Sequence, residues 1–442
     1  MFFQEGLAAF DIFADKAQKI LEQGKRIRDH VADRHPLIIV DEAQDTAEEQ
    51  WACVKALAGR SQLVCLADLD QQIYDFRPGV SAQRLVQIVN DLKPDRVDLK
   101  SQNHRSPGSE IIEFGNDVLL STPRAGPYKG VTRVAFRPNA TARDAAIRQS
   151  VGRLNKIIKD QIASAPKNIA ILSSWGKGVA IISRALTGNG GTISPISHHV
   201  YVDEASILLA SRLVAFLLEP KSGELSDLAE ALNLTAALFR SKGSATHLKT
   251  AKSLLVAADK CRNGKVPGQP AVAKELRSIL ANLRQHAFSG DPSKDWPDVR
   301  RCLQQSSAKP LKAIASDAEQ LMVFNRGRRI SEGLAEQWQT NGSYFRARAI
   351  LDSALMEEQL LSGSADLRGI NVMTIHKAKG KEFDGVVIFD ESRNSPLLQR
   401  GDAAPHPRSR KLLRVAITRA KHHVLILTDL FKPTPILKGH KL

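Results

Sequence analysis

The first 100 residues alternate between strand-like and helix-like apolar spacing. Short apolar runs predict strands at residues 37–40, 63–67 and 97–99, and we interpret the first two as buried strands of a parallel sheet. Apolar positions three and four apart predict one amphipathic helix or two within residues 7–31, and another helix at 46–57. Strands and helices that alternate in this way are typical of an α/β fold.

The rest of the chain has a long helical middle between two strand-rich parts. An apolar helix is expected at residues 206–218, stopped by Pro220, and residues 221–361 are mostly helical in pattern. The basic, Pro-containing tail from residue 431 onward is expected to be frayed. Further strands are predicted at residues 131–136, 168–172, from 370, at 386–389 and at 424–428.

Composition narrows the class of protein. Hydrophobic residues make up 43% and charged residues 25% of the chain, which is ordinary for a water-soluble globular protein. The formal net charge of +16 favours a polyanionic partner, nucleic acid before an anionic membrane. Four widely spaced cysteines without a CxxC pair argue against a zinc site and suit the reducing cytoplasm. No apolar run reaches the length of a membrane span.

The first candidate chemistry follows the strand at 37–40. That strand ends in Asp41 and Glu42, and ligands of open α/β sheets bind beyond the carboxyl ends of strands. Mg²⁺ takes carboxylate oxygens and nucleotide phosphates together, so an Asp to hold Mg²⁺ and a Glu to orient water fit nucleoside triphosphate hydrolysis. A solvated acidic turn after a strand is the alternative interpretation of the pair.

Two later turns carry further polar and aromatic residues. Residues 67–79 follow the second strand and place Gln71 shortly before Tyr74, Phe76 and Arg77. The amide can sense a phosphate and the aromatics can meet a base, although such aromatics are more often core residues. After the third strand, Arg105 lies in a turn from which its planar guanidinium can reach a phosphate, although an exposed charge is the commoner role.

The C-terminal part adds two runs that complete a resemblance. Residues 370–384 include His376 and Glu382, and residues 410–421 include a Thr-Arg-Ala sequence centred on Arg419, which we expect within a helix. With the acidic run at 41–45, the run at 68–77 and the Asn-His-Arg-Ser run at 103–106, they resemble five successive motifs of UvrD/Rep/PcrA-type superfamily 1 DNA helicases. Their order and spacing match as well as their residues.

The resemblance implies a fold and a domain order. It implies RecA-like parallel sheets of the P-loop NTPase type, the first domain incomplete and the second complete, with an inserted, mainly α-helical subdomain. The expected segments are 1–96 for the partial first RecA-like domain, 97–215 and 366–442 for the second, and 216–365 for the inserted accessory subdomain.

The resemblance also implies residue roles, cofactors and partners. Asp41 would hold Mg²⁺, Glu42 would position the attacking water and Gln71 would sense the γ-phosphate of ATP. Arg105 and Arg419 would stabilise the transition state, Glu382 would face the ribose, and His104 would stand where a Tyr usually stacks on adenine. Tyr74, Phe76, Arg77 and His376 would contact single-stranded DNA, with duplex DNA as the other partner and movement in the 3′-to-5′ direction. Outside the motifs, a surface salt bridge for Glu382 and a core position for His376 are the plainer alternatives.

One expected motif does not occur in the sequence. These helicases hold the β- and γ-phosphates in a GxxxxGK[ST] loop, and no such string occurs in the 442 residues. The nearest imitation, Trp-Gly-Lys-Gly at residues 175–178, lies in the wrong half of the chain. Since only 40 residues precede Asp41, we expect a chain cut within its first RecA-like domain. The hypotheses are a truncated helicase, a DNA-binding or regulatory remnant without ATPase activity, and half of a split helicase completed by a partner with the loop.

Overall fold

The protein divides into two compact units, which we describe separately. Unit 1 contains Met1–His104 and Asp402–Arg414, and unit 2 contains Arg105–Gly401 and Val415–Leu442. The computed structural model describes residues 13–73, 80–81, 83–98, 103, 105–188, 194–201, 204–241, 245–322, 325–362 and 367–442.

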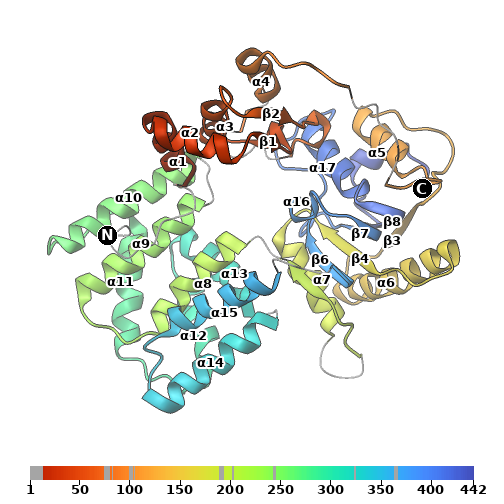
Figure 1. The fold of residues 1–442 in the computed structure, drawn as a ribbon. Coiled ribbons are helices and arrows are strands. Elements are labelled where there is room, and N and C mark those ends of the chain that lie inside the picture. Colours follow the sequence, from red (N-terminus) through yellow and green to blue (C-terminus); the bar gives the residue numbers. More distant parts are fainter. Residues whose placement is uncertain are drawn as a thin grey trace. The chain divides into compact units, whose positions relative to one another are not determined.

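Unit 1 is built around two parallel strands, β1 (Leu37–Val40) and β2 (Gln62–Cys65). Leu37 pairs with Gln62 and Val40 with Cys65, as predicted for two strands joined by a crossover helix. The remaining elements are α1 (Phe13–Gln23), α2 (Lys25–Arg34), η2 (Ala43–Asp45), α3 (Glu48–Leu57), η3 (Leu69–Gln71) and α4 (Arg84–Leu92) (Figure 1).

The strands of unit 1 are not buried on both faces, and in this respect the prediction was wrong. Val40 and Cys65 pack with Trp51 and Ile88 from α3 and α4, which form the small core of the unit. Ile39, in contrast, is 60% exposed. Successive side chains of a strand point to opposite faces, and within the described residues these two helices cover only one face of the pair.

The third predicted strand is also wrong where it can be tested. Val97 and Asp98 lie outside any strand, and Val97 is 79% exposed. No described strand pairs with them, so an apolar residue in this short run does not become part of a sheet. Residue 99 lies outside the described residues.

Unit 2 contains a six-stranded, fully parallel sheet in the order β3-β8-β7-β4-β6-β5. The predicted strands from 131 onward are all present, because each is an apolar run buried by helices. Helices α6 (Ala140–Ile162) and α7 (Gly176–Thr187) pack into one core with the strands (Figure 1). The strands are β3 (Val131–Phe136), β4 (Asn168–Ser173), β5 (His199–Tyr201), β6 (Gly369–Thr374), β7 (Phe383–Asp390) and β8 (Ala420–Asp429).

The predicted helical middle is confirmed as a run of helices around a second large core. The first of them, α8 (Glu204–Leu218), ends before Pro220 as predicted, and residues 213–218 are all buried. The others are α9 (Glu224–Ser241), α10 (Ala245–Arg262), α11 (Ala271–Arg284), α12 (Pro292–Gln305), α13 (Lys309–Met322), α14 (Asn325–Asn341) and α15 (Ala347–Ser362). Within the described part of the chain, no helix combines the length and apolarity needed to cross a bilayer.

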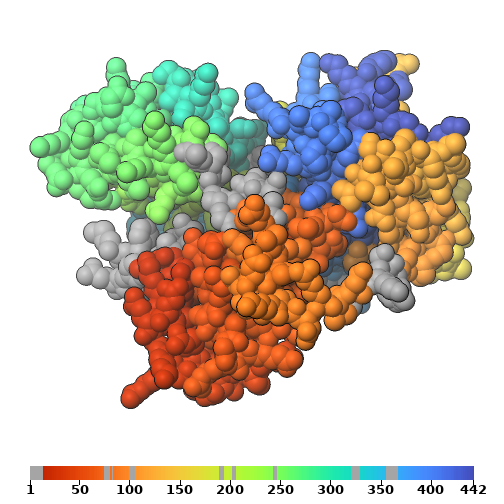
Figure 2. All heavy atoms as spheres, turned by 90° about the horizontal axis from the view of Figure 1, so that it is seen from above, coloured from red at the N-terminus to blue at the C-terminus, as the bar shows by residue number. Residues whose placement is uncertain are grey.

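Two C-terminal predictions need correction. The predicted helix around Arg419 is α17 (Pro407–Ile417), which ends before that residue because the chain turns directly into β8. The tail is not frayed: η4 (Pro435–Leu437) buries Ile436 and Leu437. The His440 ring meets Phe114 of α5 (Ile111–Leu120) edge-on at 5.7 Å, and the dark blue tail lies against the orange segment in Figure 2.

Candidate functional site

The acidic pair of unit 1 lies at the carboxyl end of β1. Asp41 is exposed and its Oδ1 accepts a hydrogen bond from the Glu42 backbone N–H at 2.8 Å. Glu42 has a left-handed backbone conformation, with φ at 51° and ψ at 40°. This conformation is unusual for a residue other than glycine, and it turns the chain sharply after the strand.

A buried amide joins this turn to the end of the neighbouring strand. Gln44 is fully buried, and its Nε2 donates to Glu42 Oε2 at 2.5 Å. Its Oε1 accepts from the Asp68 backbone N–H at 3.1 Å. The two strand ends are therefore held at one edge by a side chain to which sequence reasoning assigned no role.

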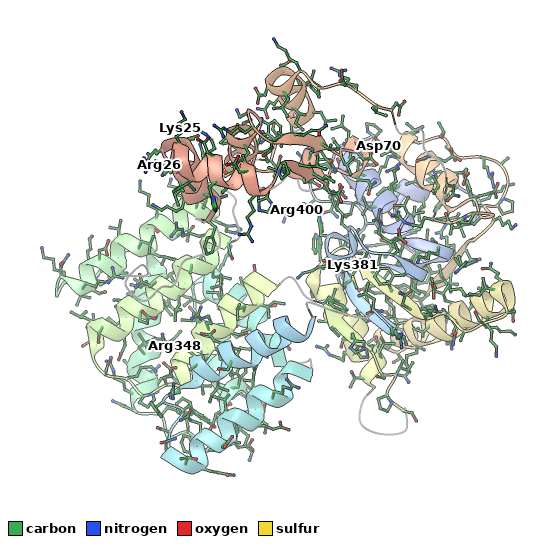
Figure 3. The ribbon with its side chains drawn as sticks, viewed as in Figure 1. Lys25, Arg26, Asp70, Arg348, Lys381 and Arg400 are labelled. Atoms are coloured by element: carbon green, nitrogen blue, oxygen red, sulfur yellow. The ribbon has the colours of Figure 1, made fainter. Side chains whose placement is uncertain are left out.

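Gln71 lies beside the same edge. Its Nε2 donates to Asp68 Oδ2 at 2.8 Å, and Asp68 Oδ1 accepts from the Asp70 backbone N–H at 2.8 Å. Asp70, labelled in Figure 3, lies in η3, five residues beyond the end of β2. The Gln71 amide is thus held by a carboxylate, from which it would have to turn to contact a ligand.

Two cations of α17 contact this segment within unit 1. Lys411 Nζ donates to the Leu69 carbonyl at 2.9 Å, and Arg414 Nη1 lies 3.7 Å from Asp68 Oδ2. Residues separated by more than 300 positions therefore share one edge. Both contacts were missed in the sequence analysis, because a contact between a strand end and a helix so far along the chain produces no local sequence pattern.

The acidic edge is compatible with Mg²⁺ shared with a nucleotide. Within the described ranges, no group of three His, Cys, Asp or Glu residues is arranged to hold a metal by itself. Mg²⁺ is commonly bound through one or two carboxylates together with substrate phosphates, and this requires only an accessible oxygen donor such as Asp41.

In unit 2, Arg105 and Glu382 form an ion pair. Arg105 Nε donates to Glu382 Oε1 at 2.8 Å, and its Nη1 donates to the Thr418 carbonyl at 2.8 Å. Lys421 Nζ lies 3.5 Å from Glu382 Oε2. The hydrogen bond from Arg105 and the positive charge of Lys421 lower the pKa of Glu382.

These residues lie at the amino-terminal edge of the six-stranded sheet. Glu382 directly precedes β7, and Thr418 lies two residues before the first residue of β8. Lys381, labelled in Figure 3, is in the same turn. The structure therefore brings together residues from the runs at 103–106, 370–384 and 410–421. They meet at the amino-terminal edge, whereas ligands of open α/β sheets usually bind at the carboxyl edge.

Arg419 lies in the same turn but is buried, with 2% of its surface exposed. Its Nε donates to the Val415 carbonyl at 3.1 Å, and its Nη2 donates to Thr418 Oγ1 at 3.2 Å. The guanidinium is thus directed back onto the end of α17, the helix that precedes it. Its contact with a phosphate would require a change of side-chain conformation.

His376 lies at the opposite, carboxyl edge of this sheet. It is half-buried in the single-turn helix α16 (Ile375–Ala378), which follows β6 directly. Thr374 caps this turn by accepting a hydrogen bond from the Lys377 backbone N–H. The other expected DNA and adenine contacts, Tyr74, Phe76, Arg77 and His104, lie outside the described residues.

A second Asp-Glu pair shows that the sequence pattern alone does not determine whether such carboxylates are accessible to a ligand. Asp390 ends β7 and is 3% exposed; its carboxylate accepts from the Leu397 N–H at 3.2 Å and from Thr428 Oγ1 at 3.1 Å. Burial raises its pKa to about 6. Glu391 beside it is paired with Arg143 and Asn394. Both carboxylates of this pair are therefore bound by other groups of the protein, whereas Asp41 remains exposed to solvent.

Comparison with known proteins agrees with the five runs. Residues 3–92 match the model of the UvrD/REP helicase N-terminal domain, and residues 294–429 match that of the UvrD-like helicase C-terminal domain. The chain belongs to the UvrD/Rep-like superfamily 1 helicases. Within this family it is similar to YjcD of Bacillus subtilis, provisionally named an ATP-dependent DNA helicase, with 25% identity over 94% of this chain and 54% of YjcD.

Two other relatives match over shorter segments. The ATP-dependent DNA helicase Rep of Escherichia coli is 32% identical over 24% of this chain and 15% of its own length. The exonuclease/helicase subunit RexA of Lactococcus lactis is 29% identical over 26% of this chain and 10% of its own. The chain spans about half the length of YjcD, the one of these relatives that it matches almost throughout.

Proposed function

We propose that this protein works in an ATP-dependent DNA helicase or translocase of the UvrD type, moving 3′ to 5′ along single-stranded DNA. The observation that carries the proposal is the pairing of Arg105 with Glu382 beside Thr418, which joins three family-like runs in unit 2. Membership of the helicase family supports the class of activity, and we place the protein in the cytoplasm with its DNA.

The accessible carboxylate of Asp41 is our candidate ligand for Mg²⁺, which would neutralise charge on the phosphates of ATP when bound. Glu42 would orient the attacking water, and its hydrogen bond from buried Gln44 fixes one carboxylate oxygen. Gln71 would contact the γ-phosphate after leaving Asp68. An amide that exchanges one anionic partner for another is suited to report whether the phosphate is present.

Arg105 and Arg419 are our candidates for charge stabilisation in the transition state. The Arg105 side chain is 29% exposed and already oriented by two hydrogen bonds, whereas Arg419 would have to release its hydrogen bond to the Val415 carbonyl. Glu382 would contact the ribose and keep Arg105 in position. An arginine in this role contributes about 10³- to 10⁵-fold to phosphoryl transfer.

Hydrolysis also needs a loop that cradles the phosphates. The 442 residues contain no GxxxxGK[ST] string, so we propose that the loop comes from further residues of the same protein or from a partner protein. This feature also favours a second candidate, a DNA-binding or regulatory form that does not hydrolyse ATP. The segments 1–96, 97–215, 216–365 and 366–442 remain our proposed domain division.

The test is to measure DNA binding and ATP hydrolysis of the 442-residue chain. We expect binding of an oligo(dT) strand that weakens steeply as salt rises, because phosphate contacts release counterions, and little hydrolysis without the loop. Adding a loop-bearing partner should restore hydrolysis, which Arg105→Ala should then reduce by about 10³-fold or more. Absence of DNA binding would overturn the proposed function, and vigorous hydrolysis by the chain alone would overturn the need for an added loop.

A further inference from the structure

Trp175 stands out among the four tryptophans of the protein. Trp51 and Trp296 are buried and Trp338 is half-buried in the helical core, whereas Trp175 is 39% exposed. It lies two residues beyond the end of β4, directly before the first residue of α7. A large aromatic ring is therefore presented at the carboxyl edge of the six-stranded sheet.

The backbone beneath this ring is held rigidly. Ser173 is buried; its Oγ donates to the Trp175 carbonyl at 2.8 Å and accepts from the Trp175 N–H at 3.3 Å. Ser395 Oγ lies 2.8 Å from the same hydroxyl. A Cβ on Gly178 would lie 2.1 Å from Ser173 Oγ, so the first turn of α7 packs directly on this pair. The exposure of Trp175 thus belongs to a fixed turn.

Cationic residues lie close to Trp175 in the sequence and at the ends of the paired strands. Lys177 is exposed in the first turn of α7. In the register of the sheet, Ser173 pairs with Thr374, so Trp175 and His376 each lie two residues beyond paired strand ends. Lys377 and Lys379 follow His376 and are half-buried.

We propose that Trp175 and Lys177 form a binding site for single-stranded DNA, in which the indole stacks on a base and the ammonium pairs with a neighbouring phosphate. This inference rests on the proposed function and adds two residues to it. An exposed flat ring with an exposed ammonium group two residues away matches the alternation of bases and phosphates in a single strand. A protein partner would instead be indicated by a contiguous apolar patch.

The first experiment measures affinity for a fluorescent oligo(dT) strand by anisotropy. Trp175→Ala should weaken binding by about 5- to 150-fold, because the stacking of one base is lost. Trp175→Phe keeps a ring and should stay close to the original affinity. Phe345→Ala, which removes an aromatic side chain that is 51% exposed within the helical part, serves as the matched control and should change nothing.

The second experiment separates stacking from a structural role. On an abasic strand of equal length, Trp175→Ala should bind as well as the unmodified protein, because no base is present to stack. In a salt titration on oligo(dT), Lys177→Gln should reduce the slope of log K against log salt by about 0.7, as expected for one phosphate contact to a single strand.

The outcomes are distinguishable. If the unmodified protein binds oligo(dT) but Trp175→Ala binds equally well, this inference is wrong while the proposed function stands. Equal losses on the abasic and the normal strand would also overturn base stacking. If the unmodified protein binds no single-stranded DNA, the proposed function and this inference fail together.

Discussion

Arg105 donates its Nε–H to Glu382 Oε1 over 2.8 Å, although 277 positions separate the two residues in the sequence. A second donation, to the Thr418 carbonyl, fixes the plane of the guanidinium. In the proposed function, the remaining N–H groups of Arg105 would donate to a phosphate. A planar guanidinium held by two acceptors is already oriented for a phosphate, so less side-chain entropy is lost on binding.

The Arg105–Glu382 pair should contribute little to stability, and its contribution should depend on pH. Both side chains are partly exposed, so Glu382→Gln should lower the free energy of unfolding at pH 7 by only about 0.2–1 kcal/mol. Arg105 lowers the pKa of Glu382 in the folded state. The stabilisation is therefore present above the unfolded-state pKa and is lost as pH falls through the lower folded-state value.

Urea denaturation of the protein and of Glu382→Gln at pH 7 and at progressively lower pH measures this difference. The two unfolding curves should converge under acid conditions. A difference that stays constant over the whole pH range would show that the variant acts through something other than the ion pair.

The stability contributed by Asp390 should depend on pH in the opposite direction to that of Glu382. Because burial raises its pKa to about 6, the folded protein binds more protons than the unfolded chain between the ordinary pKa and 6. Stability contributed at this site therefore falls as pH rises through that window. Relative to the unmodified protein, Asp390→Asn should gain about 2 kcal/mol between pH 4.5 and 7.5. Parallel denaturant titrations at both pH values test this, and a gain of zero would contradict it.

Gly178 and Gly152 offer a matched pair of glycine substitutions in neighbouring helices. A Cβ on Gly178 would meet Ser173 Oγ at 2.1 Å and Ser395 Cβ at 2.8 Å, so Gly178→Ala should destabilise the protein by about 1–3 kcal/mol. A Cβ on Gly152 in α6 would meet nothing within 4 Å. Gly152→Ala should therefore stabilise by about 0.5–1 kcal/mol, because alanine favours the helix. Thermal unfolding of both variants gives the comparison, and shifts of equal sign would refute it.

Replacing Gln44 should loosen the acidic edge of unit 1. Gln44→Met keeps the length of the side chain but removes its hydrogen bonds to Glu42 and to the Asp68 N–H. We expect a loss of about 1–3 kcal/mol, because polar groups near the buried side chain lose their partner. Gln62→Met, at an exposed position of β2, is the control and should lie within about 0.5 kcal/mol of the unmodified protein. Chemical denaturation of both variants provides the measurement.

Much of the fold follows from apolar spacing alone. Five strands of the large sheet are largely buried apolar runs, and α8 ends before Pro220, so local sequence predicted them correctly. The sixth, β5, is three residues long and not buried, and it was not predicted. The exposed side of β1 was not predictable, because whether an apolar side chain is buried depends on which elements cover that face. The ordered tail was missed for a similar reason: His440 contacts Phe114 of α5, more than 300 positions earlier.

The candidate site divides in the same way. The position of Asp41 after β1 follows from the sequence, since a strand end needs only a local pattern. The partners of that edge, Gln44 and Lys411, and the burial of Arg419 come from tertiary contacts. Asp390 and Glu391 repeat the acidic pattern with a filled environment, so only the structure distinguishes the accessible pair from the enclosed one.

His376 and Glu382 are six positions apart, yet they lie at opposite edges of the same parallel sheet. In the register of β4, Thr374, two residues before His376, pairs with Ser173, and Gly385, three residues after Glu382, pairs with Ile169. These two levels of the sheet are about 13 Å apart at the usual rise per strand residue. Nucleotide at one edge and DNA at the other would therefore not compete for space and would form a ternary complex in either order of addition. Thermodynamic reciprocity then requires that any factor by which DNA tightens nucleotide binding equals the factor by which nucleotide tightens DNA binding.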